Sequence, residues 1–328
     1  MNPPVTLGIL SDIHYACAAE QAKGDDYMYR GIPNPLVRGF ARSYYRFIWA
    51  HKPMRKNHML DRFLDRSAGF DYVIANGDYC CNCASVGVSN DAACQSAREC
   101  LEKLRTRFGA RFRANFGDHE LGKTGLFGDR GGMRLASWHR ARGDLGLESC
   151  WQLEIGNYVL LGVASSLIAL PVFEPDTLPG ERPEWQRLRA DQLNAIRQVF
   201  IGLRPNQRVL LFCHDPTALP FLWREEAVRS RLPQIEQTII GHLHSNLVLW
   251  KSRLLAGMPP IGFLGRGVKR MSTGLNQARL WRPFRVRLCP SLAGIELVKQ
   301  GSYCTIVLDP DAQTPICFRS HPLDRRPG

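Results

Sequence analysis

Histidines and aspartates recur in this sequence directly after short apolar runs. Five of the nine histidines stand at such positions, together with three aspartates. They are Asp12, His14, Asp78, Asp118, His119, His214, His242 and His244. Carboxylate and imidazole ligands together suit Mn, Fe and Zn better than Ca or Mg, which prefer shells made of oxygen. Because packing alone does not collect these residue types at the ends of apolar runs, the distribution predicts a transition-metal site.

The segment Gly241-His242-Leu243-His244 is the sharpest of these patterns. A single leucine spacer in a short extended turn can aim the two imidazole rings at neighbouring positions. We therefore expect these two histidines to serve two adjacent metal ions.

Rigid elements must bring these residues together, and the surrounding sequence alternates short apolar runs with helical patterns. The runs predict strands at 5–10, 72–75, 112–116, 209–213 and 238–240. Helices are predicted at 59–67, 92–108 and 185–203. This alternation is typical of α/β proteins, in which strand ends carry the chemistry.

The ordered motifs D-x-H, G-D, G-D-H-E, a lone His and G-H-x-H resemble those of the calcineurin-like metallophosphoesterase superfamily, and they extend over residues 5–244. The resemblance implies an α/β fold in four layers, with a two-sheet β sandwich core flanked by helices. It also implies a centre of two divalent or mixed-valence ions, of Mn, Fe or Zn. One ion would bind Asp12, His14 and His244, the other Asp118, His214 and His242, and Asp78 would bridge them.

Such a centre would hydrolyse a phosphomonoester or phosphodiester by attack of a metal-bridging hydroxide. The resemblance makes His119 the general acid that protonates the leaving oxygen, and not a ligand. The alternatives are a nuclease or a lipid-linked phosphate hydrolase of the same fold, or a catalytically silent metal-binding scaffold. The presence of every ligand and of His119 argues against a silent scaffold.

The sequence departs from the family pattern at two positions. Asp118 stands where the family usually has asparagine, so a neutral ligand becomes anionic. Cys81 stands where many members have an aspartate that orients the catalytic histidine, and a thiol is a weak hydrogen-bond partner. Asn82, Asp91 and Glu120 are the candidates to replace that aspartate. The neighbouring cysteines, Cys80, Cys81 and Cys83, match no strong zinc spacing, and buried thiols are the favoured interpretation.

The chain of 328 residues carries a net charge of +13, which favours anionic partners. Residues 251–295 contain nine lysines and arginines and no acidic residue, so they could contact a second phosphate or a nucleic-acid backbone. We predict a single domain over 1–328 with a basic amphipathic insertion at about 17–57 and a basic, strand-rich segment at about 251–328. Strands are expected there at 294–299 and 303–308.

The insertion contains a predicted amphipathic helix that starts at Asn34 and Pro35. Its apolar face holds residues such as Leu36 and Phe40, and arginines line the opposite face, at positions 38, 42 and 46. Such a helix can lie on an anionic membrane or guide a lipid-linked phosphate. The alternative that the sequence favours is a helix that packs its apolar face on the body of the protein.

No segment is apolar enough to be a transmembrane helix, since the longest uncharged stretch, 155–173, is interrupted by polar residues and proline. The N-terminus shows no secretory pattern, and the eleven cysteines are an odd number, so reduced thiols are expected. These features predict a cytoplasmic protein.

Overall fold

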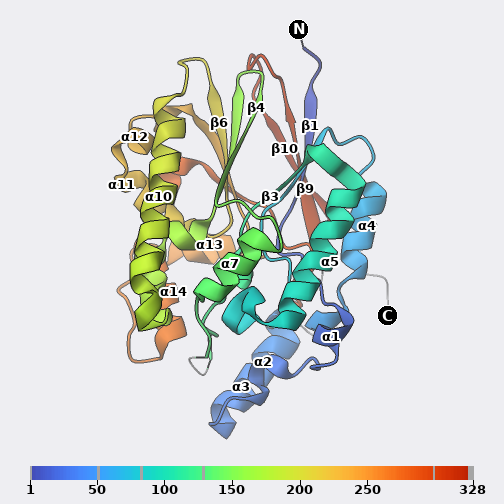
Figure 1. The fold of residues 1–328 in the computed structure, drawn as a ribbon, viewed down its shortest axis with the longest axis vertical. Coiled ribbons are helices and arrows are strands. Elements are labelled where there is room, and N and C mark those ends of the chain that lie inside the picture. Colours follow the sequence, from blue (N-terminus) through green and yellow to red (C-terminus); the bar gives the residue numbers. More distant parts are fainter. Residues whose placement is uncertain (1, 50–51, 82–83, 128–129, 298–299, 324–328) are drawn as a thin grey trace.

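The computed structural model describes residues 2–49, 52–81, 84–127, 130–297 and 300–323, and its strands form two mixed sheets of five strands each (Figure 1). The first sheet has the order β10 (Cys317–Leu323), β9 (Gly301–Leu308), β1 (Val5–Leu10), β2 (Tyr72–Ala75) and β3 (Phe112–Ala114). The second has the order β4 (Cys150–Ile155), β5 (Tyr158–Val163), β6 (Arg208–Cys213), β7 (Ile235–Ile240) and β8 (Val286–Leu288). Strands β1 to β3 are parallel, as are β5 to β8, so their carboxyl ends share one edge of each sheet.

The two sheets face each other across a layer of buried apolar side chains. Leu7 and Ile9 of β1 pack in one cluster with Leu210 and Phe212 of β6, and all four are fully buried. Successive side chains of a strand point to opposite faces, and Leu10 accordingly belongs to the separate cluster that includes the helices. Each sheet is therefore covered on both faces, as its continuous apolar strands require.

Helices cover the outer faces of both sheets. Helices α4 (His58–Arg66) and α5 (Asp91–Phe108) lie on the side of the first sheet, and α10 (Arg182–Ile201) lies on the side of the second (Figure 1). These are the three helices predicted from the sequence. The expected α/β class, a two-sheet sandwich flanked by helices, is confirmed.

Shorter helices fill the connections between these elements. They are α1 (Ala18–Gln21), α2 (Tyr27–Arg30), α3 (Pro35–Tyr44), α6 (Asp118–Leu121), α7 (Leu135–Gly143), α8 (Ser165–Ile168), α9 (Leu170–Phe173), α11 (Leu219–Arg224), α12 (Glu226–Arg229), α13 (Asn246–Leu254) and α14 (Arg266–Asn276). A π-helical segment, η1 (Tyr45–Trp49), continues α3. Short 3₁₀ segments span Pro53–Arg55, Ala84–Ser89, Gly109–Arg111, Glu174–Asp176, Pro179–Glu181, Pro216–Ala218, Leu232–Gln234 and Ala278–Phe284.

The prediction of a strand-rich C-terminal segment is wrong for its first part. After the last histidine motif the chain forms α13, α14 and a 3₁₀ segment, and strands begin only at β8. Ser245 starts α13, because its hydroxyl accepts a hydrogen bond from the N–H of Val248 and caps the helix. Residues 294–297 are not a strand, and residues 298–299 lie outside the described part of the chain. The strand predicted at 303–308 is present as β9.

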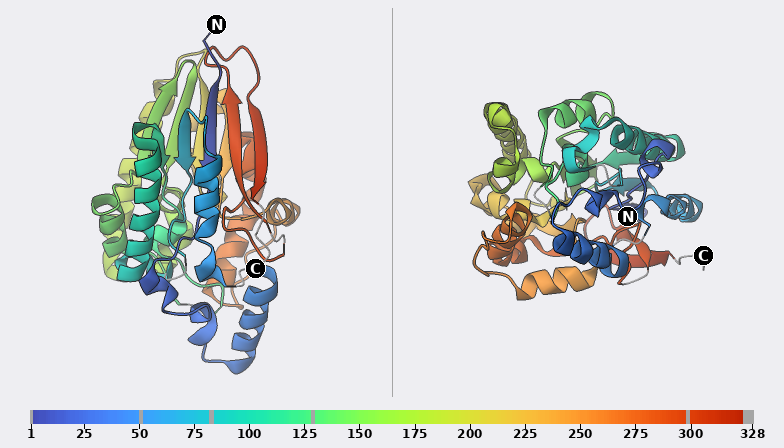
Figure 2. Two further views of the ribbon diagram at one scale, coloured as in Figure 1. Left: turned by 90° about the vertical axis from the view of Figure 1, so that its right-hand side faces the viewer. Right: turned by 90° about the horizontal axis from the view of Figure 1, so that it is seen from below.

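The insertion at about 17–57 is helical and lies at the edge of the molecule that holds the carboxyl ends of the strands (Figures 1 and 2). Asn34 caps α3 as predicted, because its side chain accepts hydrogen bonds from the N–H groups of Leu36 and Val37. The apolar face packs on the body only in part, because Ala41 is buried and Trp49 lies against His244, whereas Leu36 is 82% exposed and Phe40 64%.

None of the described helices is long and apolar enough to cross a membrane. Eight cysteines of the described ranges are free thiols: Cys17, Cys94, Cys100, Cys150, Cys213, Cys289, Cys304 and Cys317. Cys80 and Cys81 are buried, as expected, whereas Asn82 and Cys83 lie outside the described residues.

Two asparagines join the sheets next to the strand ends that carry the histidines and aspartates. Asn115 follows β3, and its side-chain amide donates to Asn76 Oδ1 and to the carbonyl oxygen of Phe212, both at 2.9 Å. Asn76 follows β2, and its own amide donates to the carbonyl oxygen of Ile239 at 3.3 Å. These bonds hold β6 and β7 of the second sheet against β2 and β3 of the first.

Asn115→Ala is expected to lower the free energy of unfolding by about 2–3 kcal/mol, because it leaves two buried acceptors without a donor. Urea unfolding measures the change. The matched control is Asn206→Ala, which removes an exposed hydrogen bond to Asn157 and should cost less than about 0.5 kcal/mol. Equal losses for the two variants would contradict the bridging role of Asn115.

Candidate metal centre

The eight predicted site residues lie together at the carboxyl ends of five strands. Three of these strands belong to the first sheet and two to the second. Asp12 and His14 follow β1, Asp78 follows β2, Asp118 and His119 follow β3, His214 follows β6, and His242 and His244 follow β7. Each strand end supplies only one or two of these side chains. Parallel strands from two facing sheets are therefore needed to gather all eight.

The backbone is strained at most of these positions. Eight non-glycine residues of the described chain have a positive φ, and five of them belong to the predicted site. These five are Asp12 (52°), His14 (51°), Asp78 (61°), His242 (60°) and His244 (58°). Each left-handed residue costs about 1–3 kcal/mol, and such strain gathers where the surrounding structure fixes a functional geometry. The tight turns carry the side chains over the ends of the sheets.

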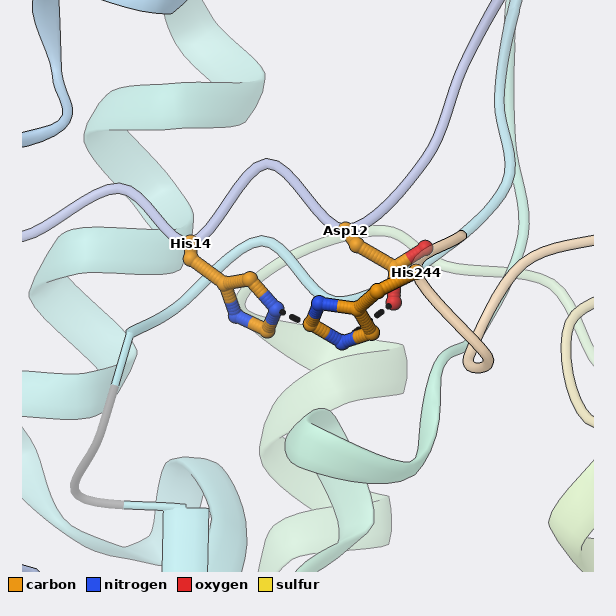
Figure 3. Close-up of side chains that lie close together, drawn as sticks. All are labelled: Asp12, His14 and His244. Carbon is orange, nitrogen blue, oxygen red and sulfur yellow. Dashed lines mark hydrogen bonds and ion pairs between the residues drawn. The ribbon is translucent and has the colours of Figure 1, made fainter. Parts of the chain in front are cut away.

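Asp12, His14 and His244 form one group with the geometry of a metal site (Figure 3). The Nε2 atom of His244 lies 3.2 Å from Asp12 Oδ1 and 3.5 Å from His14 Nε2. The ligand atoms of the three residues all lie within 4.8 Å of one another. Two imidazole nitrogens and a carboxylate oxygen thus converge on one point, which is the donor set that a borderline divalent cation prefers.

Asp118, His214 and His242 form a second group of the same kind. Asp118 Oδ1 lies 3.2 Å from His242 Nδ1 and 3.4 Å from His214 Nε2. The structure therefore places the two histidines of the G-H-L-H segment in different groups, as their spacing predicts.

Asp78 lies between the two groups. Its Oδ2 atom is 3.3 Å from His214 Nε2, and the residue also lies in a cluster with Asp12 and His214 and in one with His14 and His119. Asp78 Oδ2 and His214 Nε2 are both buried and make no hydrogen bond within the described chain. Buried polar atoms without partners are rare, and these two fit a cation that would accept both lone pairs.

Hydrogen bonds to the other ring nitrogens orient two of the imidazoles. Nδ1 of His214 lies 2.5 Å from the carbonyl oxygen of Asn76, and Nδ1 of His14 lies 3.3 Å from the carbonyl oxygen of Cys80. In both rings Nδ1 then donates to the carbonyl oxygen, and Nε2 faces the centre. This arrangement is usual for histidines that bind metals.

The charges of the centre favour ionised carboxylates. Burial raises the pKa of Asp12, but His244 and His214 outweigh it, so that the pKa lies well below its usual range. Burial and Asp118 raise the pKa of Asp78, but His119 and His214 bring it to about 2. The pKa of Asp118 is also well below its usual value, because Lys123 and His242 outweigh burial. Three buried negative charges remain.

Lys123 compensates one of these charges, and sequence reasoning missed it. Its Nζ atom lies 3.0 Å from Asp118 Oδ2, and its side chain is only 23% exposed. Burial lowers the pKa of Lys123, but Asp118 and Asp78 outweigh it and raise the pKa. The anionic residue at the position of the usual asparagine is therefore paired with a half-buried cation. A lysine five positions after Asp118 is the sequence signal for this pair.

His119 lies beside the centre with its ring 4.8 Å from that of His14. Its Nε2 atom is 3.7 Å from Asp78 Oδ2, and burial lowers its pKa to about 3, so the imidazole is neutral. Nδ1 is buried and makes no hydrogen bond among the described residues. Its backbone N–H donates to Asp78 Oδ1 at 3.0 Å, which fixes the start of α6 against β2.

None of the three proposed substitutes for the orienting aspartate fills that role in the part of the chain described here. Asp91 is exposed and pairs with Arg140, and Asn82 lies outside the described residues. The carboxylate of Glu120 accepts hydrogen bonds from three backbone N–H groups instead, those of Gly117, Asp78 and Tyr79. Burial and Asp78 raise the pKa of Glu120 to about 7. Glu120 thus ties the second motif to the third.

A cavity of about 580 Å³ opens onto the centre. His14, His119, His242 and His244 line it, together with Lys123. Trp49 of the insertion also lines it and lies against His244, with 4.5 Å between ring centroids. The sequence placed Trp49 on the apolar face of its helix but gave no sign of this contact.

Comparisons with known proteins were made by sequence and by structure. No protein-family model matches the sequence, and no curated protein matches it. Among solved structures, a dimetal phosphatase from Danio rerio is similar at 13% identity, covering 97% of this chain and 96% of that chain with a TM-score of 0.47.

Two further solved structures are similar over shorter ranges. A purple acid phosphatase from yellow lupin (Lupinus luteus) seeds matches 74% of this chain and 38% of its own at 11% identity, with a TM-score of 0.37. A phosphopantetheinyl hydrolase from Mycobacterium tuberculosis matches 74% of this chain and 84% of its own at 15% identity, with a TM-score of 0.34. The two-sheet architecture and the ordered strand-end motifs of this chain are those expected of the calcineurin-like metallophosphoesterase superfamily, which it resembles.

Proposed function

We propose that this protein is a metal-dependent phosphoesterase with a centre for two ions. Asp12, His14 and His244 would hold one ion, and a second set would hold the other: Asp118, His214 and His242. Asp78 would contact both ions. The observation that carries the proposal is the convergence of two His and Asp groups on either side of Asp78, whose Oδ2 atom is buried without a hydrogen-bond partner.

Two divalent ions at these positions would acidify a water molecule and draw charge from the phosphoryl oxygens. The protein's own groups have three further tasks. His119 lies at the wall of the cavity, where its imidazole can donate a proton to the leaving oxygen. A bound phosphate dianion would raise the pKa of this buried ring and supply the charge that keeps it protonated.

Lys123 also lies at the cavity wall, so its ammonium can face a phosphoryl oxygen while it stays paired with Asp118. Arg270 lines the same cavity and is held by Thr124 and Asp176, with its Nη2 atom donating to the carbonyl oxygen of Thr124 at 2.9 Å. These fixed cations would bind and orient an anionic ester.

The alternatives from the sequence receive less support. Several cations of the acid-free segment are engaged with the protein itself: Arg253 donates to the carbonyl oxygen of Val286, Arg279 to that of Ala256, and Arg270 pairs with Asp176. A nuclease would present such side chains to a nucleic-acid backbone. A silent scaffold would have no use for His119 beside an open cavity.

The experiment that tests the proposal is reconstitution of the metal-free protein with Mn, Fe, Zn or Mg, followed by turnover of 4-nitrophenyl phosphate and bis(4-nitrophenyl) phosphate. We expect activity with at least one of the first three metals and its loss on chelation. If no metal supports turnover of either ester, the proposed function is wrong.

Asp78→Asn is expected to lose tight binding of both ions and more than about 99% of the activity, because an amide cannot supply the charge of a shared carboxylate. Metal content after dialysis and turnover are the measurements. Asp65→Asn on the exposed side of α4 is the matched control and should match wild type. Two retained ions with near-normal turnover in Asp78→Asn would overturn the dinuclear assignment.

His119→Ala should behave differently, because His119 is proposed as an acid and not as a ligand. Metal content should survive while turnover of an alkyl phosphate falls by roughly 10²–10⁴, with a smaller loss for 4-nitrophenyl esters, whose leaving group needs no proton. His58→Ala, an exposed histidine, controls for the loss of an imidazole. An unimpaired His119→Ala variant on the alkyl ester would remove His119 from the mechanism.

The pair of Asp118 and Lys123 predicts opposite effects on inhibition by inorganic phosphate. Asp118→Asn adds positive charge to the centre and should tighten inhibition, whereas Lys123→Met should weaken it, each by roughly three- to tenfold. The double variant should return close to wild type. Inhibition constants for the four proteins test this, and Asp118→Ala with both ions and normal turnover would show that Asp118 is not a ligand.

A further inference from the structure

The cavity over the metal centre has walls far more apolar than a phosphate needs. Its volume of about 580 Å³ lies within the range of ~300–1,000 Å³ usual for small-molecule sites. Beyond the histidines and several charged residues, its lining includes many large apolar side chains, among them Met28, Ile48, Leu126, Phe173, Leu275 and Trp281. A ligand that fills this cavity would therefore reach the proposed reaction centre.

The helical insertion builds one wall of the cavity. Phe127, shortly after Lys123, packs its ring edge-on against Tyr44 and Tyr45, with centroid distances of 5.7 Å and 6.4 Å. The end of η1 is also fixed, because the N–H of Leu297 donates to the carbonyl oxygen of Ile48 at 3.1 Å. The aromatic wall is therefore a built surface held from two sides.

The outer surface of α13, on the opposite side of the cavity, carries a second apolar feature. Leu247, Trp250 and Leu254 recur at helical spacing along one face and are 40%, 59% and 70% exposed. Leu247 also lines the cavity, so the stripe runs from the inside of the cavity to the outside of the molecule. Soluble surfaces rarely expose contiguous apolar residues in this way.

The same end of the molecule exposes further apolar side chains. Leu36 on α3 is 82% exposed, and Phe263, before α14, is 87% exposed. Both α3 and α13 supply lining residues of the cavity, Tyr44 from α3 and Leu247 from α13. We call Leu36, Phe40, Trp250, Leu254 and Phe263 the apolar rim.

Cations accompany the apolar rim. Arg38, Arg42 and Arg46 of the insertion are exposed, as are Lys251 of α13 and Lys269 of α14. Exposed apolar side chains with lysines and arginines beside them are the combination by which peripheral proteins bind anionic membranes. A water-soluble ester, such as a nucleotide, would explain an aromatic cavity but not the exposed apolar rim.

We propose that the substrate is a phosphoester with a long hydrocarbon chain, taken from the surface of an anionic membrane. The cavity holds the chain, the apolar rim and its cations lie on the lipid surface, and the phosphate enters the metal centre. This inference rests on the proposed function and names its substrate class.

The first test is a chain-length series on the metal-loaded full-length protein, with n-alkyl phosphates and 4-nitrophenyl n-alkyl phosphates carrying butyl, octyl or dodecyl chains below their micelle concentrations. The value of kcat/KM should rise at least roughly tenfold from butyl to dodecyl, because each added methylene is buried. Leu247→Glu should reduce the dodecyl-to-butyl ratio at least roughly fivefold. Ile201→Glu, at an apolar position on α10 that is 60% exposed, should leave the ratio unchanged.

The second test is flotation with vesicles of phosphatidylcholine, with or without phosphatidylglycerol. We expect binding only to the anionic vesicles, weakened at high salt, and at least roughly fivefold weaker binding by the triple variant Leu36→Ser, Trp250→Ser, Phe263→Ser. Ile201→Ser is the matched control and should bind as wild type does. Circular dichroism confirms that each variant is folded.

The outcomes separate the two proposals. Metal-dependent turnover that does not depend on chain length, or that prefers a nucleoside phosphate to the dodecyl esters, overturns the lipid substrate and leaves the phosphoesterase intact. Failure of wild type to bind anionic vesicles, or equal binding by the triple variant, overturns the membrane surface. Absence of turnover with every ester overturns the proposed function and this inference with it.

Discussion

Mutual repulsion among three buried carboxylates is the constraint on which the rest of this structure depends. Asp12, Asp78 and Asp118 are at most 2% exposed, and a buried carboxylate stays ionised only where opposite charge replaces its lost hydration. The three carboxylates follow strands of the first sheet, and the imidazoles that lie against them, those of His244, His214 and His242, follow strands of the second. The two sheets must therefore face each other with their carboxyl ends at one edge, and left-handed turns must hold the side chains there.

Lys123 alters the electrostatic effect of the aspartate at position 118. Taken alone, Asp118 makes the centre more negative by one charge than a centre with asparagine. The ion pair with Lys123 offsets this charge, so the sum of the formal charges of the protein groups equals that of a centre with asparagine. The positive and negative charges of the pair nevertheless lie at different places, whereas an amide carries neither. Lys123 lines the cavity, so a phosphate in the cavity would lie near its positive charge. Metal ions at the centre would instead lie near the negative charge of Asp118.

The sequence was most informative where chemistry is local to a strand end. All eight predicted site residues lie together, because each follows an apolar run that forms its strand in the structure. The hairpin β4–β5 and the helices after His244 were not predicted. The first of these helices, α13, begins at a cap made by Ser245, in a part of the chain for which short strands were predicted. Lys123 lies in an irregular segment, and only its place five positions after Asp118 points to the ion pair. The contact of Trp49 with His244 joins segments far apart in the sequence, and no spacing rule encodes it.

The insertion is not a separate addition to the catalytic body, because it touches the metal centre itself. Trp49 packs on His244, and Phe127, in the loop that follows Lys123, packs on Tyr44 and Tyr45. A shift of the insertion would therefore change the packing of the His244 ring as well as the width of the cavity. Because interiors are close-packed, occupation of the apolar wall and the position of His244 are coupled through direct contact. The shape of the cavity and the geometry of the candidate metal centre thus depend on the same few aromatic side chains.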